Sequence, residues 1–281
     1  GKGRIVAEKN RTGIIRARHS SGSYNIHTGP GLLDRTGKLI SGVVEGRKAL
    51  IVSDKNVYSL YGAVLKRSLG SFFDTKACVL PAGEKYKTAA SVEKIYREAL
   101  KHKLDRHSVI AALGGGVIGD TAGFAAATYM RGIAVAQVPT TLLAQVDSSI
   151  GGKTGVDLPQ GKNLIGSFHQ PSIVIADTVA LKTLSRDEFL NGLAEAVKYG
   201  FIMDGPLYKY MIINRDKILA RDRDAVSHIV RRCAKNKAEI VESDEKEKTG
   251  RRAILNYGHT IGHAIEAAFE ISDDITIVLY H

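Results

Sequence analysis

The sequence predicts an α/β N-terminal domain with a parallel sheet, followed by a mainly α-helical domain. Before about residue 180, short uninterrupted apolar runs alternate with helical stretches. This pattern is typical of parallel strands whose sheet is covered by helices on both faces. After Thr183, apolar residues recur at helical spacing instead. We therefore expect a first domain over residues 1–180 and a second over residues 181–281.

Five apolar runs in the first part are short and rich in β-branched residues, which favours buried strands. Helices are expected between them, over residues 57–69 and through residues 92–100. The predicted strands are residues 49–52, 77–80, 109–113, 133–138 and 173–176.

The helical part opens with Ser185 and Glu188, which are three residues apart and form a capping-box pattern. Glu195 and Lys198 lie off the apolar stripe of this helix, and a surface ion pair is the simplest interpretation of them. Further helices are expected around residues 207–219, 225–241 and 259–269. The apolar residues that share one face of the first helix are Leu190, Leu193, Val197 and Phe201.

The chain carries a net charge of +11. Its basic residues are scattered, apart from a group between Lys2 and Arg18 that we interpret as part of a solvent-exposed N-terminal segment. The excess therefore favours attraction of small anions into a cleft over binding of nucleic acid, which needs a basic stripe. No apolar run reaches the roughly 18 residues of a membrane span. Cys78 and Cys233 stand far apart, so we expect no disulfide and a cytoplasmic location.

A glycine-rich loop follows the third predicted strand. Gly114, Gly116 and Gly119 satisfy the pattern G-x-G-x-x-G between a strand and a helix-like stretch. Glycine lets the backbone approach a diphosphate, and free N–H groups at a helix start stabilise its charge. The loop therefore predicts a Rossmann-like dinucleotide site, although a tight turn would also use glycine. Its place after the third strand, with no acidic residue about 20 positions further on, is atypical.

The central run, residues 138–155, combines hydroxyls, an Asp, a Lys and several glycines, and residues 161–166 follow at once. Lys153, Lys162 and Asn163 carry groups that bind anionic oxygens. A purely structural loop rarely needs so many glycines beside charges, so the functional interpretation is favoured. A further loop, residues 81–87, follows a predicted strand directly, where ligand loops of open sheets lie, but it is also explained as a turn.

A histidine pair near the end of the chain is a candidate metal site. His259 and His263 are four residues apart, and Glu266 continues the same helix face. Two imidazoles at this spacing can hold zinc. A solvent-facing polar stripe is the alternative, and geometry alone does not make Glu195 a further ligand.

Taken together, these motifs resemble the 3-dehydroquinate synthase family over roughly residues 23–266. The resemblance implies an NAD-binding α/β domain, a helical domain that binds zinc or cobalt, and a homodimer. It also implies conversion of 3-deoxy-arabino-heptulosonate 7-phosphate into 3-dehydroquinate and phosphate, on the shikimate route to aromatic amino acids. The segments that match, in the same order, are residues 81–87, 114–120, 138–153, 161–166, 192–199 and 256–266.

The resemblance also implies roles for individual residues. Arg131 resembles a phosphate-binding arginine that reaches the site of the partner subunit, and Glu195 and His259 match two zinc ligands. The substrate and catalytic set is Asp147, Lys153, Asn163, Lys198, Lys237, Arg252, Asn256 and His263. The cofactor set is Asp54, Asn56, Glu84, Lys87, Gly115, Gly116, Val117, Asp120, Thr140, Thr141, Lys153, Lys162, Thr183, Leu184 and Glu188.

The sequence departs from the family pattern near its end. The family has a third zinc-ligating His, which we would expect near Thr276, but the sequence there contains no His. His281 lies a few residues beyond the expected position. The family also continues into a helical stretch with another substrate-binding Lys, so we expect the metal-binding domain to be incomplete at its C-terminal end. One additional residue between Asp244 and Arg252 makes the assignment of Arg252 less direct.

Three other functions remain open at this stage. A sugar phosphate cyclase that makes inosose or valiolone rings shares the cofactor and metal motifs, and would differ in the carboxylate-binding residues Lys237, Arg252 and Asn256. A metal- and NAD-dependent polyol dehydrogenase would accumulate NADH. A non-catalytic binding protein would keep the fold without a complete metal site.

Overall fold

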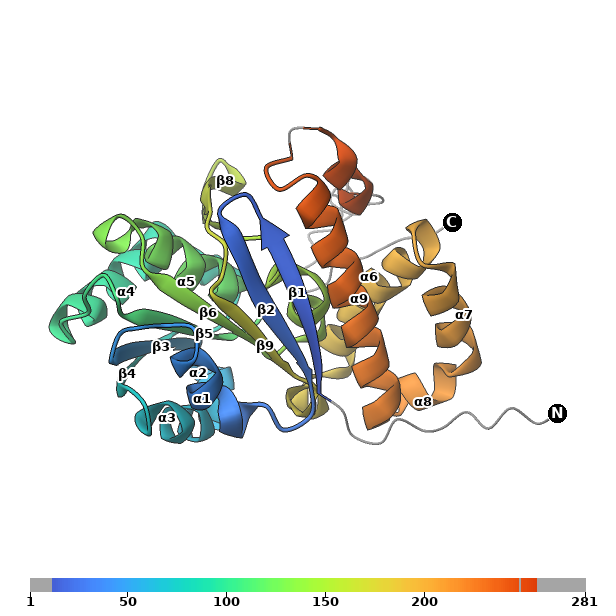
Figure 1. The fold of residues 1–281 in the computed structure, drawn as a ribbon, viewed down its shortest axis with the longest axis horizontal. Coiled ribbons are helices and arrows are strands. Elements are labelled where there is room, and N and C mark those ends of the chain that lie inside the picture. Colours follow the sequence, from blue (N-terminus) through green and yellow to red (C-terminus); the bar gives the residue numbers. More distant parts are fainter. Residues whose placement is uncertain (1–11, 248, 257–281) are drawn as a thin grey trace.

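The computed structural model describes residues 12–247 and 249–256 (Figure 1). Its centre is a seven-stranded sheet of order β1-β2-β9-β6-β5-β3-β4. Every neighbouring pair in it is parallel except β1 and β2. The strands are β1 (Gly13–His19), β2 (Gly22–Gly29), β3 (Lys48–Asp54), β4 (Asp74–Leu80), β5 (Val109–Gly114), β6 (Ala134–Pro139) and β9 (Ile173–Asp177).

The parallel strands and the helices between them confirm the predicted α/β architecture. Strand β3 explains the continuous apolar runs, because both of its faces are covered. Leu50 and Val52 belong to the core beneath α4 and α5, whereas Ala49 and Ile51 belong to the core beneath α1 and α3. The helices of this part are α1 (Thr36–Ser41), α2 (Lys55–Val57), α3 (Ala63–Gly70), α4 (Ala89–Lys101) and α5 (Gly116–Thr128), with the π-helical turn η2 (Tyr58–Gly62) between α2 and α3.

Two hairpins were not predicted from the sequence. The first joins β1 to β2 at one edge of the sheet. Arg16 and Arg18, interpreted as part of a solvent-exposed N-terminal segment, are exposed but lie in its edge strand β1, so they belong to the folded sheet. The second is a separate two-stranded sheet formed by β7 (Lys153–Leu158) and β8 (Gly161–Phe168). It starts at the end of the central run, residues 138–155, and extends past it.

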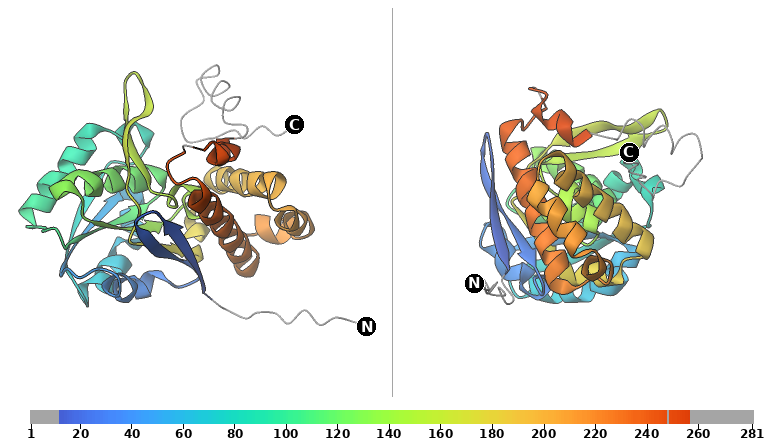
Figure 2. Two further views of the ribbon diagram at one scale, coloured as in Figure 1. Left: turned by 45° about the horizontal axis from the view of Figure 1, so that its top comes forward. Right: turned by 90° about the vertical axis from the view of Figure 1, so that its right-hand side faces the viewer.

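The second half is helical, as predicted, and gathers on one side of the sheet (Figure 2). Its longest helix, α9, lies along the β1–β2 hairpin, where Ala234 and Ala238 pack with Tyr24 and Ile26. The N-terminal hairpin and the helical half therefore share a core. The helices are α6 (Arg186–Ile202), α7 (Gly205–Ile213), α8 (Arg215–Leu219) and α9 (Arg223–Ser243), with the 3-10 helices η6 (Thr178–Thr183) and η7 (Arg251–Asn256).

Helix α6 begins as expected, because the Ser185 hydroxyl accepts a hydrogen bond from the Glu188 backbone N–H (3.1 Å). The predicted apolar face is only partly buried, since Leu193 and Val197 pack against the core whereas Leu190 and Phe201 are exposed. The helix also packs through Gly192, where an added Cβ would lie 2.5 Å from the Leu143 backbone nitrogen. The residues buried with Gly192 are Phe189, Glu195, Ala196, Lys198, Tyr199 and Gly200.

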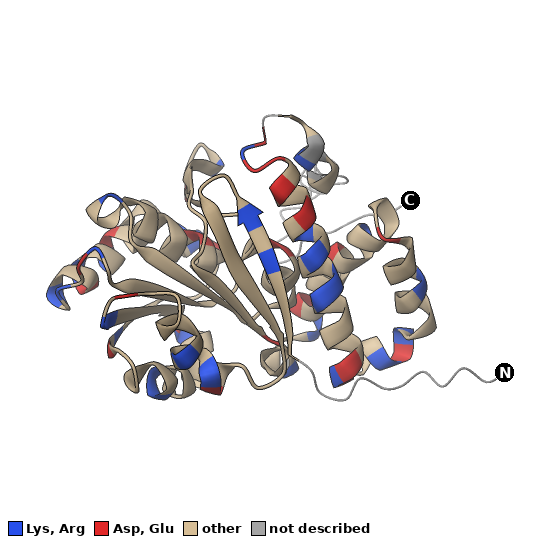
Figure 3. Cartoon of the chain, viewed as in Figure 1, with Lys and Arg blue, Asp and Glu red and all other residues tan. Residues whose placement is uncertain are grey.

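Basic and acidic side chains are mixed over both halves of the molecule (Figure 3). Cys78 and Cys233 are both buried free thiols, which agrees with the predicted lack of a disulfide. Within the residues that the structure describes, no helix is long and apolar enough to cross a membrane.

Candidate functional site

The loops that follow β3, β4, β5 and β6 carry most of the predicted cofactor residues. Because these strands are parallel, their carboxyl ends meet at one edge of the sheet. Ligands of open α/β sheets bind at this edge. The arrangement brings Asp54, Glu84, Gly115 and Thr140, four residues that the family resemblance implies for the cofactor, to a common edge of the sheet.

The glycine loop joins β5 to α5, which confirms the predicted strand-turn-helix setting. Gly114 and Gly119 serve packing, because an added Cβ would lie 2.7 Å from the Ile118 Cβ and 2.9 Å from the Gln137 Oε1, respectively. Gly115 and Gly116 begin the helix, where free N–H groups favour an anion. A Cβ on Gly116 would lie 3.2 Å from the Ser148 hydroxyl oxygen.

Two hydroxyl groups beside this loop are suited to a polar ligand. Thr140 Oγ1 and Ser148 Oγ are buried and have no hydrogen-bond partner among the described residues. A buried hydroxyl without a partner is unfavourable, so a bound polar group would stabilise it. The glycine cradle and these hydroxyls therefore fit a dinucleotide.

Lys87 links the cofactor loops to the β7–β8 hairpin. Its ammonium lies 2.7 Å from Asp120 Oδ2 and donates to Asn163 Oδ1 at 2.6 Å. Burial opposes the charge on Lys87, but the carboxylates of Asp120 and Glu84 outweigh it, so the Lys87 pKa is raised. The structure thus brings a predicted substrate residue, Asn163, into contact with the predicted cofactor residue Lys87, which in turn pairs with Asp120.

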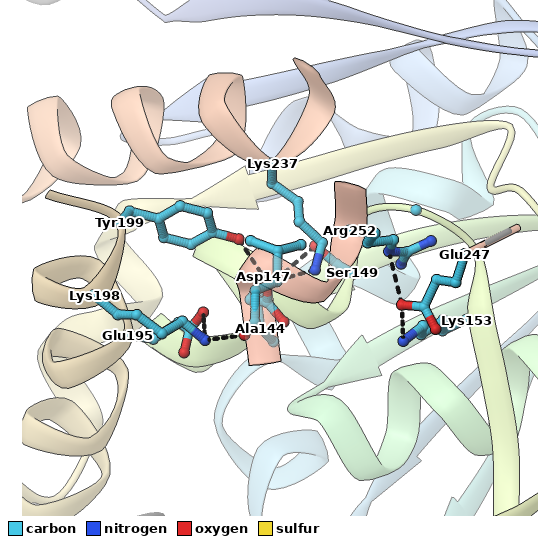
Figure 4. Close-up of polar contacts among 12 residues, drawn as sticks. Ala144, Asp147, Ser149, Lys153, Glu195, Lys198, Tyr199, Lys237, Glu247 and Arg252 are labelled. Carbon is cyan, nitrogen blue, oxygen red and sulfur yellow. Dashed lines mark hydrogen bonds and ion pairs between the residues drawn. The ribbon is translucent and has the colours of Figure 1, made fainter. Parts of the chain in front are cut away.

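Asp147 stands at the centre of the second group of predicted residues (Figure 4). It lies in the π-helical turn η5 (Ala144–Ser148), and its Oδ1 is 2.5 Å from Lys237 Nζ. The same oxygen accepts a hydrogen bond from the Tyr199 hydroxyl (2.7 Å). Burial opposes the charged carboxylate, but Lys237 and Lys198 hold the pKa of Asp147 well below its usual range. Asp147 is therefore a fixed anion.

Glu195 and Lys198 form a buried pair, which corrects the prediction of a surface pair. Glu195 Oε1 lies 2.7 Å from Lys198 Nζ, with the two side chains only 6% and 1% exposed. Lys198 also donates to the Leu255 carbonyl (2.7 Å). Burial and the nearby charge of Asp147 raise the pKa of Glu195 to about 7.

Glu195 is the one predicted metal ligand among the residues that the structure describes. Apart from its ion pair with Lys198, Glu195 Oε1 has no partner among the described residues, so a metal ion could bind it in addition to or in place of Lys198. Within these residues no three His, Cys, Asp or Glu side chains form a metal-binding group. His259 and His263 lie outside the described residues, as does the side chain of Asn256.

Lys153 and Arg252 both pair with one carboxylate, that of Glu247. Lys153 begins β7, and the Arg252 guanidinium is buried beneath Gly151. Gly151 is required there, since its φ is +99° and an added Cβ would lie 2.9 Å from Arg252 Nη2. Glu247 lies between the two cations. Sequence reasoning missed Glu247, and nothing in the charged segment 244–248 distinguishes it.

Four predicted residues belong to other segments, at the far end of α5 and around the start of α6. Arg131 follows the C-terminal end of α5, whereas the glycine loop lies at the N-terminal end of that helix. Thr183 bonds to the Tyr61 hydroxyl (2.5 Å), and Leu184 and Glu188 lie beside it at the start of α6. Tyr199 was also missed, although it ends the matching segment 192–199.

The fold and the site together define a class, the NAD- and metal-binding sugar phosphate cyclases. The chain superposes on 2-deoxy-scyllo-inosose synthase complexed with carbaglucose-6-phosphate, NAD+ and Co2+ with a TM-score of 0.83, at 29% identity, covering 92% of this chain and 70% of that one. It also matches 2-epi-5-epi-valiolone synthase from Streptomyces hygroscopicus with NAD+ and Zn2+ (TM-score 0.79, 30% identity, 88% and 68% covered). An NADH-dependent butanol dehydrogenase from Thermotoga maritima shares the fold alone (TM-score 0.65, 14% identity, 94% and 71% covered).

Within this class, the chain belongs to the 3-dehydroquinate synthase family. The family model of the 3-dehydroquinate synthase N-terminal part matches residues 77–191, and that of the C-terminal part matches residues 192–275. The chain is 52% identical over 247 residues to 3-dehydroquinate synthase of Symbiobacterium thermophilum, covering 87% of this chain and 69% of that protein. It is 49% identical to 3-dehydroquinate synthase of Nostoc sp., covering 91% and 71%.

Proposed function

We propose that the chain converts 3-deoxy-arabino-heptulosonate 7-phosphate into 3-dehydroquinate and phosphate. One observation carries this proposal beyond family membership. Four cations lie in two neighbouring groups (Figure 4): Lys237 and Lys198 act on Asp147, whereas Lys153 and Arg252 pair with Glu247. A substrate with both a carboxylate and a phosphate requires such a set, because fixed cations bind anionic oxygens and hold them in position through successive steps.

The chain's own residues supply binding and orientation. The N–H groups at Gly115 and Gly116 would receive the diphosphate of NAD. Asp147 is fixed as an anion by Lys237 and the Tyr199 hydroxyl, and in turn it holds the Lys237 ammonium at the site. When bound, NAD accepts and returns a hydride, and the metal polarises the oxygen at the reacting carbon.

The metal would be held by Glu195 and His259, with His263 as an orienting or proton-transfer group. A buried carboxylate with its pKa raised to about 7 supports this role for Glu195, because a divalent cation supplies the charge that would favour its ionised form. We further propose a homodimer in which Arg131 serves the partner's site, and a cytoplasmic location. The position of Arg131 at the far end of α5 supports the former.

The test is phosphate release from the heptulosonate phosphate with Zn2+ or Co2+ and a catalytic amount of NAD. We expect continuous release without accumulation of NADH. Accumulation of NADH equal to product would instead indicate a dehydrogenase.

A second sugar phosphate, without a carboxylate, separates the family's reaction from those of the other cyclases. The similarity to 2-deoxy-scyllo-inosose synthase makes a hexose 6-phosphate the appropriate comparison. We expect at least tenfold lower kcat/KM with it, because charged hydrogen bonds such as those of Lys237 and Arg252 contribute about 1.5–3 kcal/mol each. Preference for the hexose phosphate would refute the assignment.

A further inference from the structure

The segment between α9 and η7 places a carboxylate between two cations of the site. Glu247 Oε1 lies 2.5 Å from Lys153 Nζ and 3.3 Å from Arg252 Nε. A single oxygen therefore meets both cations (Figure 4). These are the cations that the proposed function assigns to anionic groups of the substrate, and the proposed function gives no role to Glu247.

Arg252 needs an anion at this position. Its side chain is only 1% exposed, and its Nη1 donates to the neutral carbonyl of Glu245 (2.9 Å). A buried guanidinium without a counter-ion is strongly unfavourable, so Glu247 stabilises it in the ligand-free protein. An anionic oxygen from a ligand would meet the same requirement.

The pair lies where a ligand can reach it. The side chains of Lys153 and Glu247 are 49% and 33% exposed, whereas Lys237, the cation that pairs with Asp147, is only 6% exposed. Glu247 also has a left-handed backbone (φ 55°), which a residue with a Cβ disfavours, and Gly250 follows at φ 77°. The Glu247 backbone N–H donates to the Asp244 carbonyl (3.3 Å), so the turn does not depend on the side-chain contact with the cations.

We propose that Glu247 is an internal counter-ion that occupies the anion-binding position between Lys153 and Arg252, and that an anionic oxygen of the substrate or of phosphate displaces it. The inference rests on the proposed function for the identity of the substrate. Charge is conserved in the exchange, since one carboxylate leaves as one anionic oxygen arrives. Displacing Glu247 costs free energy, so it weakens ligand binding. When no ligand is bound, Glu247 keeps Lys153 and Arg252 paired with an anion.

Inorganic phosphate is the probe, titrated calorimetrically into the NAD-loaded protein. Glu247→Gln keeps the size of the side chain and removes its charge. We expect phosphate to bind about fivefold tighter to Glu247→Gln than to the unmodified protein, because the competing internal state is lost. Equal or weaker binding would overturn the inference and indicate that Glu247 instead positions the two cations for the ligand.

Two controls separate displacement from a general change of charge. Glu239→Gln removes one charge from the exposed face of α9, where Glu239 pairs with Lys235 at 3.7 Å, and should leave phosphate binding unchanged. In a Lys153→Ala background, the tightening by Glu247→Gln should fall below about twofold, because one of the two cations that it acts through is absent. An undiminished effect there would overturn the inference. The titration needs no turnover, so a failure of the proposed reaction, seen as no phosphate release, is distinguishable from it.

Discussion

Removing the charge of Asp147 should destabilise the protein far more than removing the charge of a surface acid. Asp147→Asn keeps the shape of the side chain and leaves the Tyr199 hydroxyl with an oxygen to bind. It also leaves Lys237, whose side chain is 6% exposed, without the carboxylate that lies 2.5 Å from it. Breaking a buried ion pair on one side costs about 3–5 kcal/mol. We expect the lower end, about 3 kcal/mol, because Asp147 is itself 26% exposed on its side chain.

Urea denaturation of the NAD-loaded protein measures this free energy of unfolding. Glu93→Gln is the matched control, since Arg97 and Glu93 lie 2.6 Å apart but both are largely exposed. Such a pair contributes about 0–1 kcal/mol. The double variant Asp147→Asn/Lys237→Met should recover at least about 2 kcal/mol relative to Asp147→Asn, since two neutral groups leave no unpaired charge. A loss below about 1 kcal/mol in Asp147→Asn, or no recovery in the double variant, would refute the reasoning.

Three further predictions follow from other parts of the structure. In the phosphate-release assay, Lys153→Ala should lower kcat/KM about 10- to 100-fold, as expected for a lost charged hydrogen bond. Lys209→Ala in α7 is the control and should change kcat/KM less than about twofold. Equal small losses in both variants would contradict the placement of Lys153 in the substrate site. Gly151→Ala should cost about 2 kcal/mol or more in thermal unfolding, because φ is +99° and the new Cβ meets Arg252; an unchanged Tm would contradict this. Burial opposes the charge on Asp204, but hydrogen bonds from Arg232 and Asn236 lower the pKa of its carboxyl. The charged carboxylate therefore stabilises the folded protein above the unfolded pKa of about 4, and this stabilisation is lost as pH falls through the lower pKa of the folded state. Asp204→Asn should therefore flatten the acid limb of the unfolding curve, and an unaltered limb would show that Asp204 does not contribute to it.

The sequence was informative where burial is uniform. The strands around residues 49–52 and 109–113 are apolar on both faces, so a continuous apolar run identifies them. Strand β1 alternates exposed and half-buried residues and includes Arg16 and Arg18, so its composition resembles that of a loop. The β7–β8 hairpin was missed for a related reason, because its glycines and charges indicate ligand binding as much as a strand.

The site was predictable in composition but not in geometry. Helical spacing placed Glu195 and Lys198 off the apolar stripe of α6, yet the close approach at Gly192 turns that face inward. A buried charged pair cannot be distinguished from a surface pair by its spacing, because both lie three residues apart. Glu247 gave no signal, since its contact with Lys153 depends on a left-handed backbone within a run of charges.

The two carboxylates that face the cations of the substrate site differ in how firmly they are held. Asp147 accepts hydrogen bonds from the buried Lys237 and from the Tyr199 hydroxyl. A ligand that displaced Asp147 would therefore have to replace its contacts with both donors and neutralise the buried charge of Lys237. Glu247 is itself 33% exposed on its side chain and pairs with a half-exposed Lys153. A site that must bind a polyanion and then release phosphate needs both kinds of contact. Permanent pairs keep the cations in place, and a weak internal pair lets the anion enter and leave without ever uncovering Arg252.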